Sequence, residues 1–381
     1  MANKITLNDI LKLYLDNVNL VASTRDNNLE LEVKFGTKNI KRINKIDYDN
    51  VIQYLLSCGF TSSSDQYKLR IFNEFVDPKT GVTKLSTIRT ELSGIGKISK
   101  YCKNNKIVDD DEMSLANFEQ KFYFKNGDDT VYPLDFDDFN FRVSLQQERS
   151  LSENSGVVKS IISNWSNSKK VFRYMCRHTF RHPLYPVKVD MSIVKSSKQQ
   201  GKQPIPEYQF VDSGLLESQE KYEIEIELDY GKIRQGNFDN VDALSTAIKK
   251  VIKFVMSGLQ GTNFPISYSL QSAILDQYMT VLWGKKHTSG SRVLPKNFVG
   301  PSQYTLQINN IIPTDNNSTE PNIRKNYTVT EKADGERKLL YITKDGKMYF
   351  INTNMGVEFT GAYTPQTKFF TIQLLMESIL N

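Results

Sequence analysis

Two short stretches decide the fold of this chain: Glu30-Leu31-Glu32-Val33-Lys34 and Glu223-Ile224-Glu225-Ile226-Glu227. Both alternate charged and apolar residues with the period of a β-strand, so each predicted strand carries its carboxylates on one face. Neighbouring carboxylates on such a face lie about 6–7 Å apart and raise one another's pKa unless a positive charge lies between them. Either stretch alone also fits an amphipathic strand with a solvated acidic face. The two together, with the basic strands described below, predict a divalent-cation site.

Length and composition indicate a two-domain protein without disulfides. The chain has 381 residues and a formal net charge of +6, which permits a polyanionic partner without requiring one. The isolated cysteines Cys58, Cys102 and Cys176 form no CxxC pair, so neither a disulfide framework nor a zinc site is predicted. His178 and His182 are four apart but lie in strand-like surroundings, where that spacing does not favour a metal pair. With neither a membrane-length apolar segment nor a signal peptide, we expect a soluble, intracellular protein.

The pattern of alternating residues and turns predicts a barrel followed by helices. Eight or so strand-like segments at this spacing favour a closed antiparallel sheet, at residues 29–35, 67–76, 84–92, 118–125, 139–147, 171–181, 186–195 and 221–229. Helical spacing is present at residues 6–20, 240–258 and 267–283. A Gly- and Pro-containing break at 284–301 predicts a linker. Strand-like segments return at 326–332, 338–343 and 347–353, before a last helix-like stretch.

Charged residues recur on one face of several of these strands. The predicted inward set comprises Thr87, Arg89 and Glu91; Glu119, Lys121, Tyr123 and Lys125; Arg142, Ser144, Gln146 and Glu148; Arg173, Arg177 and Arg181; and Lys188, Asp190 and Ser192. Taken singly, each is more typical of an exposed face. Taken together, they predict a tunnel with a charged interior, whose apolar outer face packs against helices.

Such a tunnel suits a 5′-triphosphate. Arginine offers a planar fork to phosphate oxygens, and carboxylate oxygens favour Mg²⁺ or Mn²⁺. A metal that polarises the terminal phosphate, with a spare carboxylate to orient water, predicts hydrolysis of a γ-phosphate.

The two glutamate stretches resemble the paired signature of the triphosphate tunnel metalloenzymes, in particular the metal-dependent RNA 5′-triphosphatases of fungi and large DNA viruses. The resemblance covers about residues 28–230. It implies that Glu30, Glu32 and Glu227 are metal ligands, that Glu225 is a further ligand or orients water, and that Glu223 supports the site. It matches Arg89, Lys121 and Arg177 to phosphate-binding positions, Glu148 to an acidic tunnel residue, and Asp190 and Ser192 to a later strand. The strand pattern adds Lys34, Arg142, Arg173 and Lys188 as phosphate-binding candidates.

One position departs from that family's pattern. Met175 lies two residues before Arg177, where the family usually has a second basic residue. We expect Arg173 or Arg181 to compensate.

A second chemistry is predicted beyond the linker, at Lys332-Ala333-Asp334-Gly335-Glu336-Arg337. This segment resembles the nucleophile motif of RNA guanylyltransferases and polynucleotide ligases. The resemblance implies that Lys332 attacks the α-phosphate of GTP and that Arg337 contacts the nucleotide; the attack requires a deprotonated amine. Residues 294–301 resemble the lead-in of viral capping enzymes. Because the later motifs of that family are missing, we expect a fragment of a longer polypeptide.

We therefore expect an α+β protein: a closed antiparallel β-barrel with flanking helices at residues 1–284, a linker at 285–301 and a partial nucleotidyltransferase fold at 302–381. The leading hypothesis is the N-terminal part of a viral-type mRNA-capping enzyme, acting in the host cytoplasm or virion. Its predicted partners are 5′-triphosphate RNA, GTP and a methyltransferase domain or subunit. The alternatives are a tunnel phosphatase acting on tripolyphosphate or NTP, an ATP-dependent ligase, and a non-catalytic RNA-binding capping subunit.

Overall fold

The structure is a computed structural model, and it describes residues 5–22, 26–37, 41–108, 115–236, 238–299, 305–313, 319–329, 335–364 and 373–380. The chain divides into two compact units, residues 1–261 and 262–381. Within the described residues, no helix is both long and apolar enough to cross a membrane.

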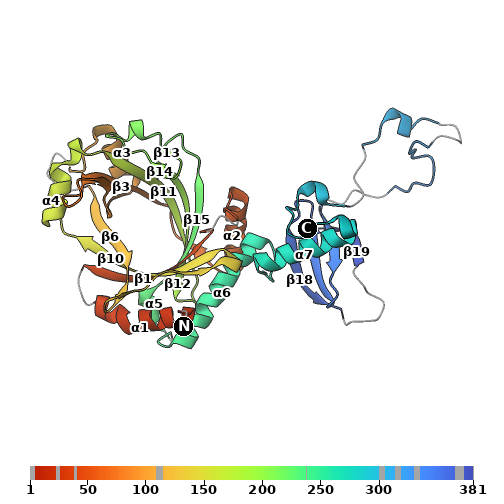
Figure 1. The fold of residues 1–381 in the computed structure, drawn as a ribbon, viewed down its shortest axis with the longest axis horizontal. Coiled ribbons are helices and arrows are strands. Elements are labelled where there is room, and N and C mark those ends of the chain that lie inside the picture. Colours follow the sequence, from red (N-terminus) through yellow and green to blue (C-terminus); the bar gives the residue numbers. More distant parts are fainter. Residues whose placement is uncertain are drawn as a thin grey trace. The chain divides into compact units, whose positions relative to one another are not determined.

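The first unit is a closed antiparallel barrel of eight strands (Figure 1). Around the ring, β11 pairs with β12, then β15, β1, β10, β6, β5 and β3 follow, and β3 pairs back with β11. The barrel strands are β1 (Asn27–Phe35), β3 (Gln66–Val76), β5 (Ile88–Ser93), β6 (Asn117–Tyr123), β10 (Phe141–Leu151), β11 (Lys170–Arg181), β12 (Val187–Ser196) and β15 (Lys221–Leu228). The predicted barrel is confirmed, and each of its strands overlaps one of the eight segments expected from the sequence.

Shorter elements complete this unit. The short strands are β2 (Thr61–Ser62), β4 (Thr83–Leu85), β7 (Lys125–Asn126), β8 (Asp129–Thr130), β9 (Leu134–Phe136), β13 (Gln199–Gln200) and β14 (Gln203–Pro204). The helices are α1 (Leu7–Ala22), α2 (Lys45–Ser57), α3 (Ile95–Asn104), α4 (Gly156–Ser163), α5 (Tyr230–Gln235) and α6 (Val241–Gln260).

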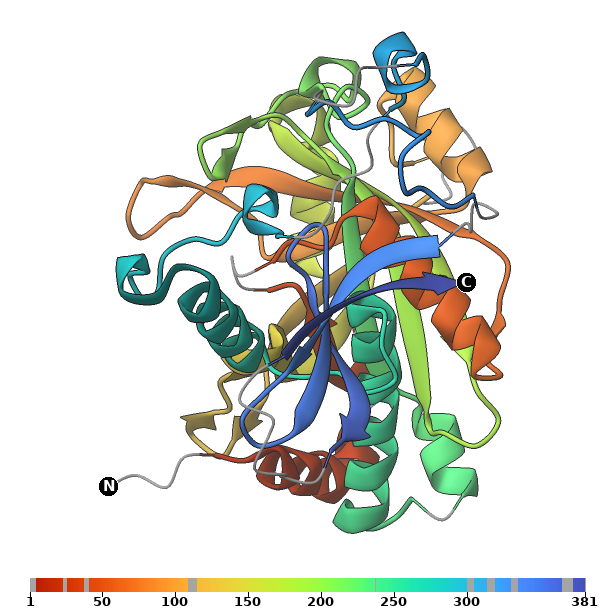
Figure 2. The same cartoon turned by 90° about the vertical axis from the view of Figure 1, so that its right-hand side faces the viewer.

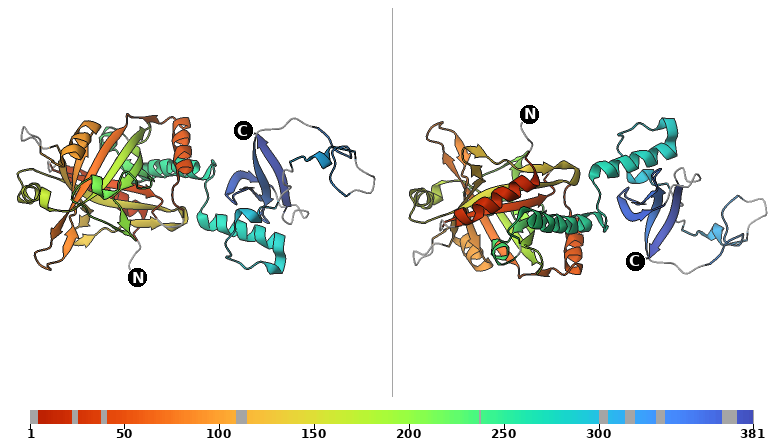
Figure 3. Two further views of the ribbon diagram at one scale, coloured as in Figure 1. Left: turned by 90° about the horizontal axis from the view of Figure 1, so that it is seen from above. Right: turned by 90° about the horizontal axis from the view of Figure 1, so that it is seen from below.

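The apolar core of the barrel unit lies outside the ring of strands. On β1, Leu29, Leu31, Val33 and Phe35 are buried and join a cluster that includes residues of α1, α2 and α6. Figure 3, in its view from below, shows α1 lying across the strands beside α6. Because side chains alternate along a strand, burying these residues outside turns the glutamates of β1 into the barrel.

A second apolar layer covers another part of the barrel wall. Leu69 and Ile71 of β3 pack with Tyr101 of α3, Trp165 and Phe172. Because the two apolar layers cover the outer face of the barrel wall, the charged faces of the strands line the interior. The inside-out pattern predicted from the sequence therefore has a packing cause: each strand buries its apolar face under helices or loops.

The second unit is a helix packed on an antiparallel sheet. The helix α7 (Tyr268–Trp283) contributes Ile274, Tyr278 and Met279 to a core shared with the sheet. The sheet has the order β18-β17-β16-β19 and is drawn in blue in Figure 2. Its strands are β16 (Gly335–Ile342), β17 (Lys347–Asn352), β18 (Val357–Tyr363) and β19 (Gln373–Leu380).

The unit boundary differs from the expected one. We predicted that residues 267–283 belong with the barrel, but the apolar face of α7 packs against the second unit's sheet, and the division falls after Gly261. The expected linker at 285–301 also takes part in this unit, because Val293 and Phe298 pack on the same core. The Tyr278 hydroxyl donates to the Asn297 carbonyl at 2.9 Å.

Two sequence predictions in the second unit are wrong. Residues 326–329, the described part of the strand expected at 326–332, form no strand. The last stretch, expected to be helical, contains β19, which pairs along its length with β16. Pairing with β16 makes this segment a strand, and the local residue pattern carries no information about that pairing.

Candidate active site

The two glutamate strands lie side by side in the barrel. Their register places Glu32 opposite Glu227 and Lys34 opposite Glu225. Directly opposed residues on one face of an antiparallel pair have Cβ atoms about 4.5–5.5 Å apart. The carboxylates that the sequence predicted as a metal site are therefore neighbours across β1 and β15.

Each predicted metal ligand has a lysine counter-ion. Lys121 Nζ lies 2.7 Å from a Glu30 oxygen and 3.5 Å from a Glu32 oxygen. Lys188 Nζ lies 2.9 Å from a Glu227 oxygen. Burial, followed by the nearby Glu30 carboxylate, raises the pKa of Glu227 to about 7. These carboxylates are partly buried on one face of the barrel wall, and a bound cation would relieve the repulsion between Glu30 and Glu227.

A second cluster fixes Arg177. Its guanidinium donates to Asp190 at 2.8 Å, to Ser192 at 3.1 Å and to Glu225 at 3.1 Å. Lys34 Nζ contacts the other Glu225 oxygen at 2.5 Å. Although burial acts to raise the pKa of Glu225, Lys34 and then Arg177 outweigh it and hold the value at about 2. Glu225 is thus an ionised hydrogen-bond acceptor held at both oxygens.

A third cluster joins Arg89 to two acidic residues. Arg89 donates to Glu119 at 2.6 and 2.8 Å and also forms an ion pair with Glu148. Burial and then the Glu30 carboxylate raise the pKa of Glu148 to about 7. Through Glu148 this cluster is continuous with the predicted metal ligands.

The remaining predicted basic residues differ in their surroundings. Arg173 pairs with Glu223 at 2.5 Å, and Lys34 also reaches Glu223 at 3.4 Å, so both join the tunnel network. Arg142 donates to Asp135 of β9 at 2.7 Å and lies opposite Lys34 across β10 and β1, and within the described residues it forms no ion pair with a tunnel glutamate. Its phosphate-binding role has the least structural support of the set.

The structure adds Lys68 and Arg70 to the interior, where both pair with the predicted inward residue Glu91. Lys68 and Arg70 each lie 2.7 Å from a different oxygen of Glu91, and Lys68 is directly opposite Met175 across β3 and β11. Lys68 therefore places a cation beside the position where the family pattern has a second basic residue. The alternation Lys68-Leu69-Arg70-Ile71 carried the signal, since its basic residues share one face of the strand.

Asp65, Cys176 and His178 form a separate group on the outward-facing side of β11. His178 Nδ1 lies 2.9 Å from Asp65, and Cys176 Sγ lies 3.8 Å from His178 Nε2. No metal role was expected here from the isolated cysteines or from the His178 and His182 spacing, and His182 does not join the group.

The donor set of the tunnel fits a hard divalent cation. Glu30, Glu32 and Glu227 offer carboxylate oxygens only, from adjacent strands and one shared face. Oxygen-only donors favour Mg²⁺ or Mn²⁺ over the softer metals that prefer thiolate or imidazole. These three residues would hold the ion.

The predicted nucleotide site is only partly visible. Lys332 lies outside the described residues. Arg337 on β16 is described; its guanidinium lies 5.4 Å from the centre of the Phe298 ring, and Nη2 is buried with no hydrogen-bond partner found among the described residues.

Comparisons with known proteins found a viral relative and several similar solved structures. No protein-family model matches the chain. It is 23% identical over 367 residues to a probable mRNA-capping enzyme of Acanthamoeba polyphaga mimivirus. The similarity is to a viral mRNA-capping enzyme. It covers 92% of this chain and 25% of that enzyme, so the chain spans about a quarter of its relative's length. The resemblance to viral capping enzymes that we predicted is confirmed.

Solved structures of RNA triphosphatases are also similar. The RNA triphosphatase domain of a trifunctional mimivirus capping enzyme matches with a TM-score of 0.39 at 18% identity, covering 66% of this chain and 99% of that one. An RNA triphosphatase of S. pombe matches with a TM-score of 0.35 at 12% identity, covering 66% and 94% of the two chains.

Proposed function

We propose that the barrel unit removes the γ-phosphate from 5′-triphosphate RNA with the help of Mg²⁺ or Mn²⁺. One observation carries this proposal. Glu30, Glu32 and Glu227 meet on one wall of a closed barrel whose other strands carry Lys121, Arg89 and further inward cations. The similarity to a mimivirus capping enzyme supports RNA as the substrate.

The tunnel cations suit phosphate because each is held in place by carboxylates. Arg177 is fixed by Asp190 and Glu225, and Arg89 by Glu119 and Glu148. Preorganised cations stabilise charge without rearranging during the reaction, which is the usual source of catalysis in phosphoryl transfer. Lys121 and Lys188, which neutralise the predicted metal ligands, would be available to phosphate oxygens once a cation is bound to those glutamates.

The chemistry assigned to the site is hydrolysis. A divalent cation held by Glu30, Glu32 and Glu227 would act as a Lewis acid toward the γ-phosphoryl group. Glu225 orients the attacking water as a fixed acceptor. The oxygen of water bonds to the γ-phosphorus, and the bond from that phosphorus to the β,γ-bridging oxygen breaks. Inorganic phosphate and a 5′-diphosphate end are released, and the proton that the water loses passes to the solvent. Arg89 and Arg177 stabilise the charge that is spread over the phosphoryl oxygens.

The test is release of phosphate from γ-³²P-labelled RNA, run beside inorganic tripolyphosphate. We expect release that depends on Mg²⁺ or Mn²⁺ and is lost in Glu30→Gln and Glu227→Gln. An exposed glutamate outside the tunnel, Glu153, provides the matched control as Glu153→Gln. Full activity in the tunnel variants would refute the assignment, and activity on tripolyphosphate alone would favour the tripolyphosphatase alternative.

We also propose that the second unit begins a guanylyltransferase domain that uses GTP. In this reaction the Lys332 amine bonds to the α-phosphorus and pyrophosphate leaves. The buried Nη2 of Arg337, which has no partner among the described residues, supports an anionic ligand at β16. The test is labelling of a longer chain by [α-³²P]GTP that is stable to alkali and labile to acid, as a phosphoramidate is, with loss of the label in Lys332→Met. Preferential labelling by ATP would favour a ligase.

A further inference from the structure

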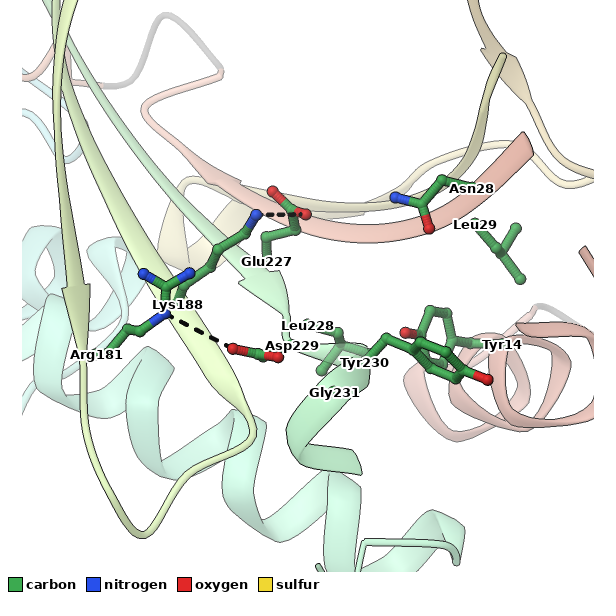
Figure 4. Close-up of a pocket in the computed structure, with 10 residues that line it drawn as sticks. All are labelled: Tyr14, Asn28, Leu29, Arg181, Lys188, Glu227, Leu228, Asp229, Tyr230 and Gly231. Carbon is green, nitrogen blue, oxygen red and sulfur yellow. Dashed lines mark ion pairs between the residues drawn. The ribbon is translucent and has the colours of Figure 1, made fainter. Parts of the chain in front are cut away.

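A pocket of about 240 Å³ lies at one rim of the barrel, and we call it the rim pocket (Figure 4). It is lined by Tyr14, Asn28, Leu29, Arg181, Lys188, Glu227, Leu228, Asp229, Tyr230 and Gly231. These residues come from α1, the ends of β1, β11, β12 and β15, and the start of α5.

The rim pocket is continuous with the proposed active site. Lys188 and Glu227 form an ion pair at 2.9 Å that belongs to the tunnel network, and both line the pocket. Leu29 and Leu228 belong to the apolar core outside the barrel. The pocket therefore extends from the tunnel interior around the end of the strands, along the path that a group attached to a tunnel-bound triphosphate would take.

A tyrosine hydroxyl in the lining of this pocket makes no hydrogen bond within the part of the chain that the structure describes. Tyr14 is 1% exposed overall. It shares the pocket lining with Glu227, and burial followed by the Glu227 charge raises the pKa of Tyr14. The hydroxyl of a largely buried tyrosine usually has a hydrogen-bond partner. A polar ligand group in the pocket would provide one.

The pocket also offers a weakly held cation. Arg181 is 47% exposed, and its ion pair with Asp229 is long, at 3.7 Å. Arg177, on the same strand, is 13% exposed and has contacts of 2.8 and 3.1 Å. The Arg181 guanidinium is thus the more available of the two to a phosphate oxygen. Tyr230 adds an aromatic side chain, and its hydroxyl donates to Asn19 at 2.5 Å.

We propose that the rim pocket binds the first nucleoside of the 5′-triphosphate RNA. Tyr14 hydrogen-bonds a polar group of that nucleoside, and Arg181 binds the phosphate that follows the γ- and β-phosphates. This inference rests on the proposed triphosphatase function and makes the site selective: a triphosphate that carries a nucleoside gains contacts that inorganic tripolyphosphate does not make.

The first test compares two substrates. Tyr14→Phe should lower kcat/KM for 5′-triphosphate RNA about 2- to 10-fold, the range for one lost hydrogen bond, without changing kcat/KM for tripolyphosphate. Arg181→Met should lower kcat/KM for both substrates, because tripolyphosphate also presents a third phosphate to Arg181. Tyr48→Phe is the matched control, because the Tyr48 hydroxyl is buried without a partner and lies on α2. Equal losses of Tyr14→Phe on both substrates, its unchanged activity on RNA, or an equal loss in Tyr48→Phe would overturn the proposal.

The second test needs no turnover and separates this inference from the proposed function. RNA with a β,γ-imido 5′-triphosphate and 4-thiouridine as its first nucleotide is photo-cross-linked to the chain. We expect cross-links to the peptides that contain Tyr14, Asn28 or Tyr230. Cross-links near Arg173 and Glu223, toward the other end of β15, would refute the rim pocket even if the barrel proves to be a triphosphatase. If neither substrate is hydrolysed, the proposed function fails and the cross-link still decides the pocket.

Discussion

Replacing Arg177 by methionine should destabilise the barrel unit strongly. The Arg177 side chain is 13% exposed and pairs with Asp190, which is 3% exposed, and with Glu225, which is 9% exposed. Glu225 keeps Lys34 at 2.5 Å, but within the described residues Asp190 keeps only the hydrogen bond that the Thr179 hydroxyl donates at 2.6 Å. Most of the cost should therefore come from Asp190, left as a buried carboxylate without an ion pair.

The expected loss in unfolding free energy is about 3–5 kcal/mol, the usual cost of removing one partner of a buried ion pair. With a urea m-value of about 3 kcal/mol/M for a domain of this size, the midpoint should fall by roughly 1–2 M. The double variant Arg177→Met, Asp190→Asn should recover most of the loss, because it removes the charge that was left unpaired.

Urea unfolding followed by tryptophan fluorescence measures this change, since Trp165 is buried in the barrel unit. The control is Arg181→Met on the same strand; its pair with Asp229 is long and exposed, so we expect a loss below about 1 kcal/mol. A loss of that small size in Arg177→Met, or no recovery in the double variant, would refute the reasoning.

Two further predictions concern stability. Burial acts to raise the pKa of Glu91, but Arg70 and then Lys68 hold it at about 2, below the usual 4.5. Because this pKa is lowered on folding, Glu91 should contribute about 3 kcal/mol above pH 4.5 that disappears as the pH falls toward 2. Acid titration of unfolding should therefore show a smaller loss in Glu91→Gln than in the wild-type chain; parallel curves would count against it. At Gly258 on α6, an added Cβ would lie 2.7 Å from Val51 Cα, so Gly258→Ala should lower the free energy of unfolding by about 1–3 kcal/mol through overpacking, measured as a lower melting temperature. Gly96→Ala on the exposed side of α3, where nothing lies within 4 Å, should instead be neutral or stabilising.

The barrel was predictable because its strands are amphipathic in an unambiguous way. Each glutamate strand alternates charged residues with large apolar ones, and the helices that bury the apolar face leave the charged face inside. The same rule would have placed Lys68 and Arg70 in the tunnel. Arg142 also follows this alternation, but it pairs with Asp135 near the end of its strand. Alternation along a strand predicts the face on which a side chain lies, and not the residue that it contacts.

Other features depend on contacts between distant segments. The helical pattern of α7 was visible, but its pairing with the sheet of the second unit depends on shape and register, which the pattern does not contain. Tyr14 lies on a helix more than 200 residues before Glu227 in the sequence, and only the folded chain brings its hydroxyl near that carboxylate. Packing, and not composition, makes Tyr14 a candidate for substrate binding.

The most direct test of the central claim is to locate the metal. Crystals of the chain grown with Mn²⁺ would show the ion through its anomalous scattering. We predict a peak bound by the carboxylates of Glu30, Glu32 and Glu227 inside the barrel, which disappears in Glu227→Gln. A peak at Asp65, Cys176 and His178 instead, with none at the tunnel glutamates in a preparation that hydrolyses 5′-triphosphate RNA, would contradict the account.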